Sequence, residues 1–250
     1  MNWVLEVKDL AKYFDGTRAI NGLSVTLAQN KITSLIGPNG AGKTTLFNVI
    51  TGFLRPDQGQ VYYRGKSIIG LPPHRISSLG IVRTFQNLRL IKMISVLDNV
   101  LLAFREQKGE SLWGVMPGIK NRRAEQKNRE KAMDILRFLG LADKADDLAE
   151  ALSYGQQKLL TLACCLATGA DLLLLDEPVA GLHPETIDKV LQIIRELSNQ
   201  GKTIFFIEHH MGAVMDISDW VIVMDEGRKI AEGEPEIIKE DQRVIEAYLT

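Results

Sequence analysis

The sequence of 250 residues predicts an α/β protein built on a parallel sheet. Four short apolar runs have the length and composition of strands that are buried on both faces. They are Ile32–Ile36, Leu172–Leu175, Thr203–Ile207 and Trp220–Met224. Between the second and third runs, Glu185–Gln200 carries its apolar residues on one helical face, and Gly201 follows as a stop signal. A strand, a helix and a strand in this order predict a right-handed crossover between parallel strands.

The middle of the chain has a different pattern. From about residue 88 to 150 no run of strand character occurs, and Arg122–Leu139 is predicted as a helix that ends at Gly140. We therefore expect a single domain, 1–250, made of two parts. The α/β core is predicted over 1–87 and 155–250, and an inserted helical lobe over 88–154.

Composition and charge narrow the class of protein. The chain is 45% hydrophobic and 24% charged, which is typical of a globular protein and argues against a disordered one. Thirty Lys and Arg residues against 31 Asp and Glu residues leave a net charge of -1, so charge gives no support to nucleic-acid binding. No apolar run approaches the roughly 18 residues of a membrane span. The first ten residues also lack the basic and apolar regions of a secretory signal.

The only two cysteines, Cys164 and Cys165, are neighbours in the sequence. Neighbouring cysteines provide neither a disulfide framework nor a site with four thiolate ligands. They are therefore interpreted as small apolar residues inside a helix. Together with the absence of a signal or a membrane span, this interpretation predicts a protein of the reducing cytoplasm.

A glycine-rich loop directly after the first buried strand predicts a phosphate-binding site. The loop matches G-x-x-x-x-G-K-[ST] between a strand and the apolar helix expected at 46–51. Its glycines let backbone N–H groups surround phosphate oxygens, and the helix N-terminus adds its positive end. Lys43 is placed to reach β- and γ-phosphates, and the Thr44 hydroxyl is placed to bind Mg²⁺. The residues expected to contact nucleotide here are Gly37, Pro38, Asn39, Gly40, Ala41, Gly42, Lys43, Thr44 and Thr45.

Two adjacent carboxylates, Asp176 and Glu177, end the second apolar strand. Because side chains alternate along a strand, the two are expected to face different directions and to take different roles. Asp176 suits Mg²⁺, directly or through water, and Glu177 suits the general base that activates or orients an attacking water. Together with the phosphate-binding loop, this pair predicts a site that hydrolyses a nucleotide.

Four further motifs complete an ordered set along the chain. They are Gln86 within Arg83–Asn87, Leu152-Ser153-Tyr154-Gly155-Gln156, Ala180–His183 after the carboxylate pair, and His209 after the strand Thr203–Ile207. In this order they resemble the Q-loop, the L-S-G-G-Q signature, the D-loop and the switch histidine of the ATP-binding cassette (ABC) superfamily. The resemblance covers essentially the whole chain. It implies a RecA-like P-loop NTPase core with an N-terminal antiparallel β region and an inserted α-helical lobe.

A narrower group shares further features with this sequence. They are Arg83–Leu90, a long apolar and basic insertion before Arg129, the Ser-Tyr-Gly-Gln variant of the signature, and the ending Val244–Leu249. Together they are similar to the ATPase subunits of branched-chain amino-acid uptake transporters. That group has relatives that serve urea and short amides, so the resemblance implies an importer and leaves the solute open.

The resemblance also implies roles for individual residues. Glu177, His209 and Gln86 correspond to the catalytic set, and Gln86 joins Thr44 and Asp176 around Mg²⁺. An aromatic residue before the loop stacks on the adenine of ATP. Tyr13 and Phe14 both lie there, and the alignment of residues 12–16 favours Phe14.

Pairing of two cassettes is a further implication of the resemblance. Two subunits arranged head to tail bury two ATP molecules, so that the signature of one subunit faces the phosphate-binding loop of the other. The signature residues expected to act in this way are Leu152, Ser153, Tyr154, Gly155 and Gln156. Ser153 stands at an expected helix start, where its hydroxyl and the helix dipole meet a γ-phosphate. Tyr154 replaces the first glycine of the motif, and His183 stands where Asp or Asn is usual, so the contacts of both are open.

The function implied is that of a transport ATPase on the inner face of the cell membrane. Its partners would be transmembrane permease subunits, a second ATPase subunit that is identical or related, and indirectly a solute-binding protein outside the cell. Residues 87–94 are expected to contact the permease, with the region of Trp113 as the alternative. A cassette protein acting on DNA or ribosomes is disfavoured because the sequence shows neither a second cassette nor a basic domain. A regulator without turnover is disfavoured by Glu177 beside Asp176.

Overall fold

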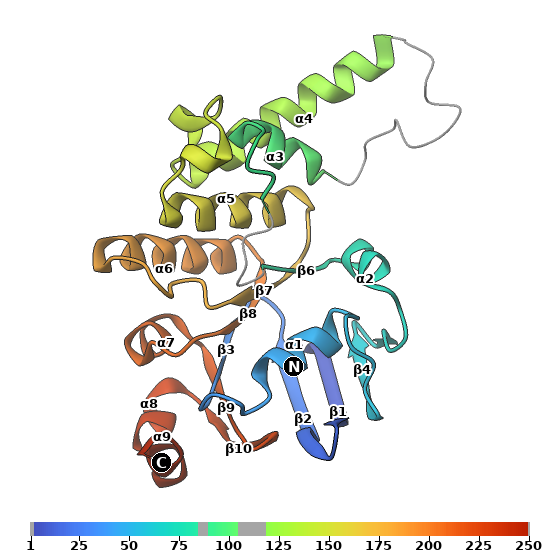
Figure 1. Ribbon diagram of the computed structural model, residues 1–250, viewed down its shortest axis with the longest axis vertical. Coiled ribbons are helices and arrows are strands. Elements are labelled where there is room, and N and C mark those ends of the chain that lie inside the picture. The colour runs from blue at the N-terminus through green and yellow to red at the C-terminus, as the bar shows by residue number, and fades with distance from the viewer. Residues whose placement is uncertain (1–2, 85–89, 105–118, 250) are drawn as a thin grey trace. The chain divides into compact units, whose positions relative to one another are not determined.

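A computed structural model describes residues 3–84, 90–104 and 119–249 (Figure 1). The chain forms two compact units, which are Met1–Arg83 with Asp171–Thr250, and Thr84–Ala170. The second unit extends past residue 154, where the helical lobe was predicted to end, because it includes helix α5 (Tyr154–Ala167).

The first unit contains a six-stranded sheet in the order β10-β9-β3-β8-β7-β6. The bounds are β3 Ile32–Ile36, β6 Ile81–Arg83, β7 Leu172–Asp176, β8 Thr203–Ile207, β9 Trp220–Asp225 and β10 Arg228–Gly233. All four strands predicted from apolar runs are confirmed, and each pairs in parallel with its neighbours among them. Strands β6 and β10 were not predicted, because β6 has only three residues and β10, which pairs antiparallel with β9, is partly polar.

Burial explains why these runs form strands. Every residue of β3, β7 and β8 is buried, as expected where both faces of a parallel sheet are covered. Since parallel strands end at the same edge of a sheet, the segments that follow β3, β7 and β8 meet there. This edge therefore collects the glycine-rich loop, the segment of Glu177 and the segment of His209.

A second, antiparallel sheet in the order β2-β1-β4-β5 confirms the predicted N-terminal β region. Its bounds are β1 Trp3–Phe14, β2 Thr17–Ala28, β4 Gln58–Tyr63 and β5 Lys66–Ser67. Helix α1 (Lys43–Ile50) supplies apolar side chains to the core shared by the two sheets. Within that core the rings of Phe47 and Phe205 lie 5.1 Å apart between centroids. Helix α2 (Pro73–Leu79) precedes β6.

Four helices complete this unit: α6 Pro184–Asn199, α7 Met211–Ile217, α8 Pro235–Glu240 and α9 Gln242–Leu249. Figure 1 shows α6 and α7 on the side of the parallel sheet opposite α1. The predicted helix Glu185–Gln200 corresponds to α6, which buries Val190, Leu191 and Ile194.

The second unit is helical where it is described, with α3 Val96–Leu102, α4 Ile119–Phe138 and α5. Helix α5 packs against both α3 and α4. The predicted helix Arg122–Leu139 corresponds to α4, and Gly140 follows it with a φ of 68°. In the described part of the chain, no helix combines the length and the apolar character that crossing a membrane requires.

Candidate active site

The glycine-rich loop packs tightly against one strand of each sheet, β9 and β2. Gly37 has a φ of 148°, and a Cβ atom there would lie 2.0 Å from the backbone oxygen of Met224. Gly42 has a φ of 96°, and a Cβ atom there would lie 2.1 Å from the backbone oxygen of Ala19. No other residue fits such contacts, so these glycines let the loop pack directly on the backbone of β9 and β2. The loop is consequently fixed in shape before any phosphate arrives.

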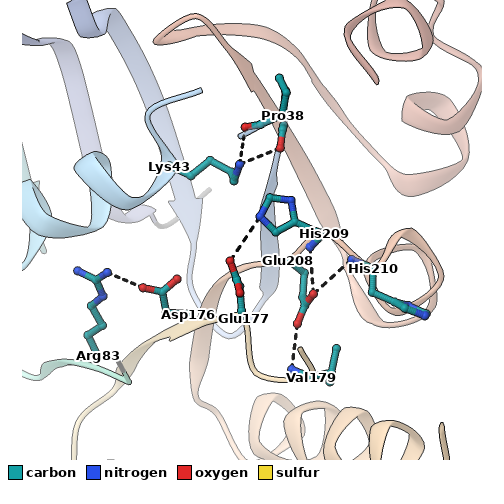
Figure 2. A network of polar contacts seen from close by, with 10 residues as sticks. Pro38, Lys43, Arg83, Asp176, Glu177, Val179, Glu208, His209 and His210 are labelled. Carbon is teal, nitrogen blue, oxygen red and sulfur yellow. Dashed lines mark hydrogen bonds and ion pairs between the residues drawn. The ribbon is translucent and has the colours of Figure 1, made fainter. Parts of the chain in front are cut away.

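Lys43 folds back onto this loop. Its Nζ donates hydrogen bonds to the backbone oxygens of Gly37 at 2.7 Å and Pro38 at 2.8 Å (Figure 2). Burial lowers the pKa of Lys43, and the nearby charges of Glu177 and Asp176 oppose this shift. The ammonium group therefore sits at the centre of the loop with two carboxylates in its electrostatic surroundings.

The other loop residues lie around the start of α1. Asn39, Gly40 and Thr44 are exposed, whereas Ala41 is buried and Thr45 is half-buried. The exposed Thr44 hydroxyl in the first turn of α1 is thus available to a ligand at the helix N-terminus.

Asp176, the last residue of β7, is held by a buried ion pair. Nη2 of Arg83 donates to its Oδ2 at 2.5 Å, and both side chains are almost fully buried. Nη1 of Arg83 donates to Asn48 Oδ1 at 2.6 Å, and the guanidinium lies 5.4 Å from the centre of the Phe47 ring. Removing one partner of such a pair typically costs about 3–5 kcal/mol, because the other charge is left buried alone. The Arg83 contacts thereby fix the orientation of the Asp176 carboxylate.

Glu177 lies beyond the end of β7, in a left-handed conformation with a φ of 50°. Its backbone N–H donates to the oxygen of Ile207 at 3.0 Å, and its Oε1 lies 3.4 Å from His209 Nε2 (Figure 2). The carboxylates of Asp176 and Glu177 do enter different surroundings, as predicted. The prediction was based on the alternation of side chains along a strand, but Glu177 lies outside β7. Its left-handed backbone therefore also contributes to the direction of its side chain. A non-glycine residue in this conformation costs about 1–3 kcal/mol, and such strain concentrates at functional sites.

The aromatic residues predicted near adenine lie at the end of β1. The Phe14 residue is 42% exposed, whereas Tyr13 is half-buried. The Lys12 ammonium lies 5.4 Å from the centre of the Phe14 ring. Phe14 belongs to the same β1–β2 hairpin as Ala19, whose backbone contacts Gly42. A ring on this hairpin therefore has an exposed face available for a base.

The predicted signature begins α5 in the second unit. Ser153 is the N-cap residue, and its Oγ accepts from Gln156 N at 3.4 Å. Gln156 Oε1 accepts in return from Ser153 N at 2.9 Å, which completes a capping box. Leu152 is buried, Gly155 is half-buried and Tyr154 is 49% exposed. The predicted helix start at Ser153 is confirmed.

The structure assigns no role in the site to two of the predicted residues. Gln86 lies outside the described residues. His183 is exposed at the N-cap position of α6, where its side chain makes no capping hydrogen bond.

The site also contains two residues that the sequence reasoning missed, Arg83 and Glu208. Arg83 holds Asp176, and the buried Glu208 accepts backbone hydrogen bonds from Val179, His209 and His210. A signal was available for Glu208, which directly follows the apolar run Thr203–Ile207, whereas the two apolar residues before Arg83 are too few to predict a strand. A charge in that position is seldom buried without a partner.

The oxygen donors fit a magnesium ion bound together with a nucleotide. Among the residues that the structure describes, no group of three or more His, Cys, Asp and Glu side chains is arranged to hold a metal by itself. Mg²⁺ commonly takes only one or two protein oxygens and completes its octahedron with phosphates and water. A hydroxyl at Thr44 and a carboxylate at Asp176 match this kind of donor set.

Comparison with known proteins assigns the chain to a family. The model of the family described as ABC transporter matches residues 20–180, and that of the branched-chain amino acid ATP-binding cassette transporter matches 228–249. The chain is 42% identical to the high-affinity branched-chain amino acid transport ATP-binding protein BraF of Pseudomonas aeruginosa, over 98% of this chain and 97% of the relative. It is 41% identical to the corresponding protein LivG of Escherichia coli (strain K12), with the same coverage.

A solved structure agrees with these sequence relatives. The nucleotide-free crystal structure of an ATP-binding cassette from an ABC transporter superposes with a TM-score of 0.86 at 36% identity, over 99% of both chains. The described fold, the phosphate-binding loop and the carboxylate pair at one sheet edge are thus those of a nucleotide-binding ATPase cassette. The chain therefore belongs to the ABC transporter family, as an ATP-hydrolysing subunit in the group that includes the branched-chain amino acid transport ATP-binding proteins.

Proposed function

We propose that this subunit powers the uptake of branched-chain or related hydrophobic amino acids through a membrane permease. The proposal is supported by relatives named for branched-chain amino acid transport at 41–42% identity over 98% of the chain. The C-terminal match at 228–249 to the family model of the same description adds to this support. In this proposal the subunit lies on the inner face of the membrane, and a solute-binding protein outside the cell delivers the amino acid to the permease.

Nucleotide is bound by residues 37–45, with Phe14 stacking on the adenine. Lys43 exchanges its bonds to the Gly37 and Pro38 carbonyls for β- and γ-phosphate oxygens. Thr44 and Asp176, with Gln86 as a further ligand, would hold Mg²⁺, which would neutralise phosphate charge when bound. The buried pair with Arg83 keeps Asp176 oriented for this role.

Hydrolysis is assigned to Glu177 and His209. In this assignment, Glu177 accepts a proton from the water that attacks the γ-phosphate, and His209 contacts the γ-phosphate and helps to fix the position of Glu177. The observation that carries this assignment is the 3.4 Å distance between Glu177 Oε1 and His209 Nε2. Glu177 follows β7 and His209 follows β8, at the same edge of the sheet at which the loop of Lys43 follows β3.

A complete site requires a second cassette, identical or related. Residues 152–156 of the partner are proposed to close over the nucleotide, with Ser153 and the N-terminus of α5 facing the γ-phosphate. The exposure of Ser153 and Tyr154 at the start of α5 supports this arrangement, because a nucleotide can then approach the N-terminal end of the helix.

The permease contact is proposed at residues 87–94. Residues 87–89 lie outside the described residues, as does Trp113. Within the described part, Met93 is 71% exposed and Ile91 is 51% exposed, so both apolar side chains are accessible to a partner. An exposed Met is well suited to contact a short partner helix, because its side chain is flexible and polarizable.

Uptake measurements test the proposal. Cells that lack this subunit should regain uptake of radiolabelled leucine, isoleucine or valine when the parent chain is restored, and not when Glu177→Gln is restored. Labelled urea and a short amide serve as alternative solutes. Restored uptake of urea without any effect on the amino acids would contradict the proposed solute, although the ATPase assignment would stand.

A further inference from the structure

The carboxylate of Glu208 connects two segments of the active site. Glu208 directly follows β8 and is only 2% exposed. Its Oε1 accepts a hydrogen bond from the backbone N–H of Val179 at 2.9 Å. Its Oε2 accepts from the backbone N–H groups of His209 at 3.0 Å and His210 at 3.3 Å (Figure 2). One buried side chain thus bonds to the backbone on both sides of the site.

These bonds begin where the sheet ends. The last residue pair between β7 and β8 is Asp176 with Ile207, and the Glu177 N–H still reaches the Ile207 oxygen. Two residues further along, Val179 N–H reaches the Glu208 side chain instead of a strand. The Glu208 carboxylate therefore continues the connection between the two segments beyond the last β7–β8 pair. It reaches past Glu177 on the β7 side and up to His209 on the β8 side.

The chemistry of this position explains why a carboxylate is present. Burying a carboxylate is unfavourable unless hydrogen bonds compensate for its lost hydration, and an apolar side chain would fill the same space without that penalty. A carboxylate has two acceptor oxygens, so it can accept from both segments at once, with one oxygen directed to each. A carboxylate at position 208 is thus costly to bury, but it connects the two backbone segments, which an apolar side chain does not do.

We propose that Glu208 is a positioning residue for ATP hydrolysis. By fixing the Val179 segment to the backbone of His209, it sets the 3.4 Å separation between the Glu177 carboxylate and the His209 ring. Glu208 itself contacts neither phosphate nor water in this proposal, and it acts through His209. The inference rests on the proposed roles of Glu177 and His209.

Glu208→Gln tests this inference with minimal change in shape. The amide keeps one acceptor oxygen and replaces the other by an NH₂ group, which cannot accept from a backbone N–H. The bonds to one of the two segments are therefore lost. We expect kcat to fall by about 10- to 100-fold, since small misplacements of catalytic groups have effects of this size. KM for ATP should stay within about twofold, because the loop and Lys43 are untouched.

A double-mutant cycle with His209→Ala distinguishes positioning from general damage. If Glu208 acts through His209, Glu208→Gln should change kcat by less than about twofold once the ring is absent, because coupled residues are not additive. Asp219→Asn is the matched control. The Asp219 carboxylate also accepts from a backbone N–H, that of Ile32 at 2.8 Å, and pairs with Lys31 at the start of β3. It should lower the melting temperature and leave kcat unchanged.

Each outcome decides for or against the inference. Normal kcat in Glu208→Gln overturns it, as does a loss that multiplies fully with that of His209→Ala. Normal turnover in His209→Ala also overturns it, and additionally removes His209 from the proposed mechanism. If the parent protein hydrolyses ATP and depends on His209, but Glu208→Gln leaves kcat unchanged, the inference about Glu208 fails and the proposed function stands. If Glu208→Gln does not fold, Glu208→Asp, whose stem is one methylene shorter, replaces it in the same cycle with the same criteria.

Discussion

Replacing Lys43 by Met should weaken ATP binding without disturbing the fold. Met fills nearly the same volume at this buried position and lacks the charge that would meet phosphate. The Lys43 ammonium donates hydrogen bonds to the backbone oxygens of Gly37 and Pro38. Binding therefore replaces existing hydrogen bonds, and the net gain is smaller than the full attraction between an ammonium and a phosphate.

The magnitude follows from these two contributions. A pair of opposite unit charges about 4 Å apart gains roughly 4 kcal/mol at an effective dielectric constant of about 20, so an ammonium that meets both the β- and the γ-phosphate gains roughly 8 kcal/mol. Giving up the two charge-assisted bonds to the carbonyls, at about 1.5–3 kcal/mol each, offsets about 3–6 kcal/mol of this. The remaining difference is at least about 2 kcal/mol, which corresponds to an affinity at least about 30-fold lower.

Isothermal titration with ATP and Mg²⁺ measures this difference directly. Lys239→Met, at an exposed position in α8, is the matched control and should bind as the parent does. Thermal melting without nucleotide checks that both variants fold. An affinity of Lys43→Met within threefold of the parent would refute the reasoning, because Lys43 would then contribute no charge to the phosphate site.

Three further predictions concern other parts of the molecule. Burial raises the pKa of Cys164 to about 12 and raises that of Cys165 further, so neither thiol should react with Ellman's reagent at pH 8 until the protein is unfolded; labelling of the folded protein would contradict this. The pKa of Asp57 is lowered because it accepts a hydrogen bond from the Tyr13 N–H at 2.7 Å. Its folded pKa then lies below its unfolded value, so its contribution to stability is present above about pH 4 and is lost as the pH falls through the folded pKa. Denaturant unfolding should accordingly find Asp57→Asn less stable than the parent at pH 7, with a difference that shrinks in acid; a difference that grows in acid would contradict this sign. Met93→Asp should reduce amino-acid uptake while ATP hydrolysis persists, whereas Ile237→Asp, an equally polar change at a side chain of similar exposure, should keep both activities; normal uptake in folded Met93→Asp would place the permease contact elsewhere.

The parts of the fold that were predictable are those encoded in continuous stretches of sequence. Ile32–Ile36 and Thr203–Ile207 are apolar throughout because both faces of the parallel sheet are buried, and this pattern is visible without a structure. The phosphate-binding loop was equally visible, since Gly37 and Gly42 are required by backbone contacts that no other residue tolerates.

The parts that were not predictable depend on partners distant in the sequence. Arg83 pairs with Asp176 across 93 positions, and Glu208 with Val179 across 29. Nothing local identifies such partners, although a charge at the end of an apolar run indicates that one is needed. The left-handed backbone at Glu177 is similarly set by its surroundings, because Glu has no intrinsic preference for it.

The most direct measurement of the central claim is phosphate release by Glu177→Gln at saturating ATP and Mg²⁺, with the affinity for ATP measured on the same preparation. Glutamine keeps the shape of the side chain and cannot accept the proton of an attacking water, so kcat should fall by about 100- to 10,000-fold. Affinity for ATP should remain close to that of the parent, because Lys43 and its loop are unchanged. A Glu177→Gln variant that binds ATP and releases phosphate at the parent rate would contradict the assignment of Glu177 as the general base.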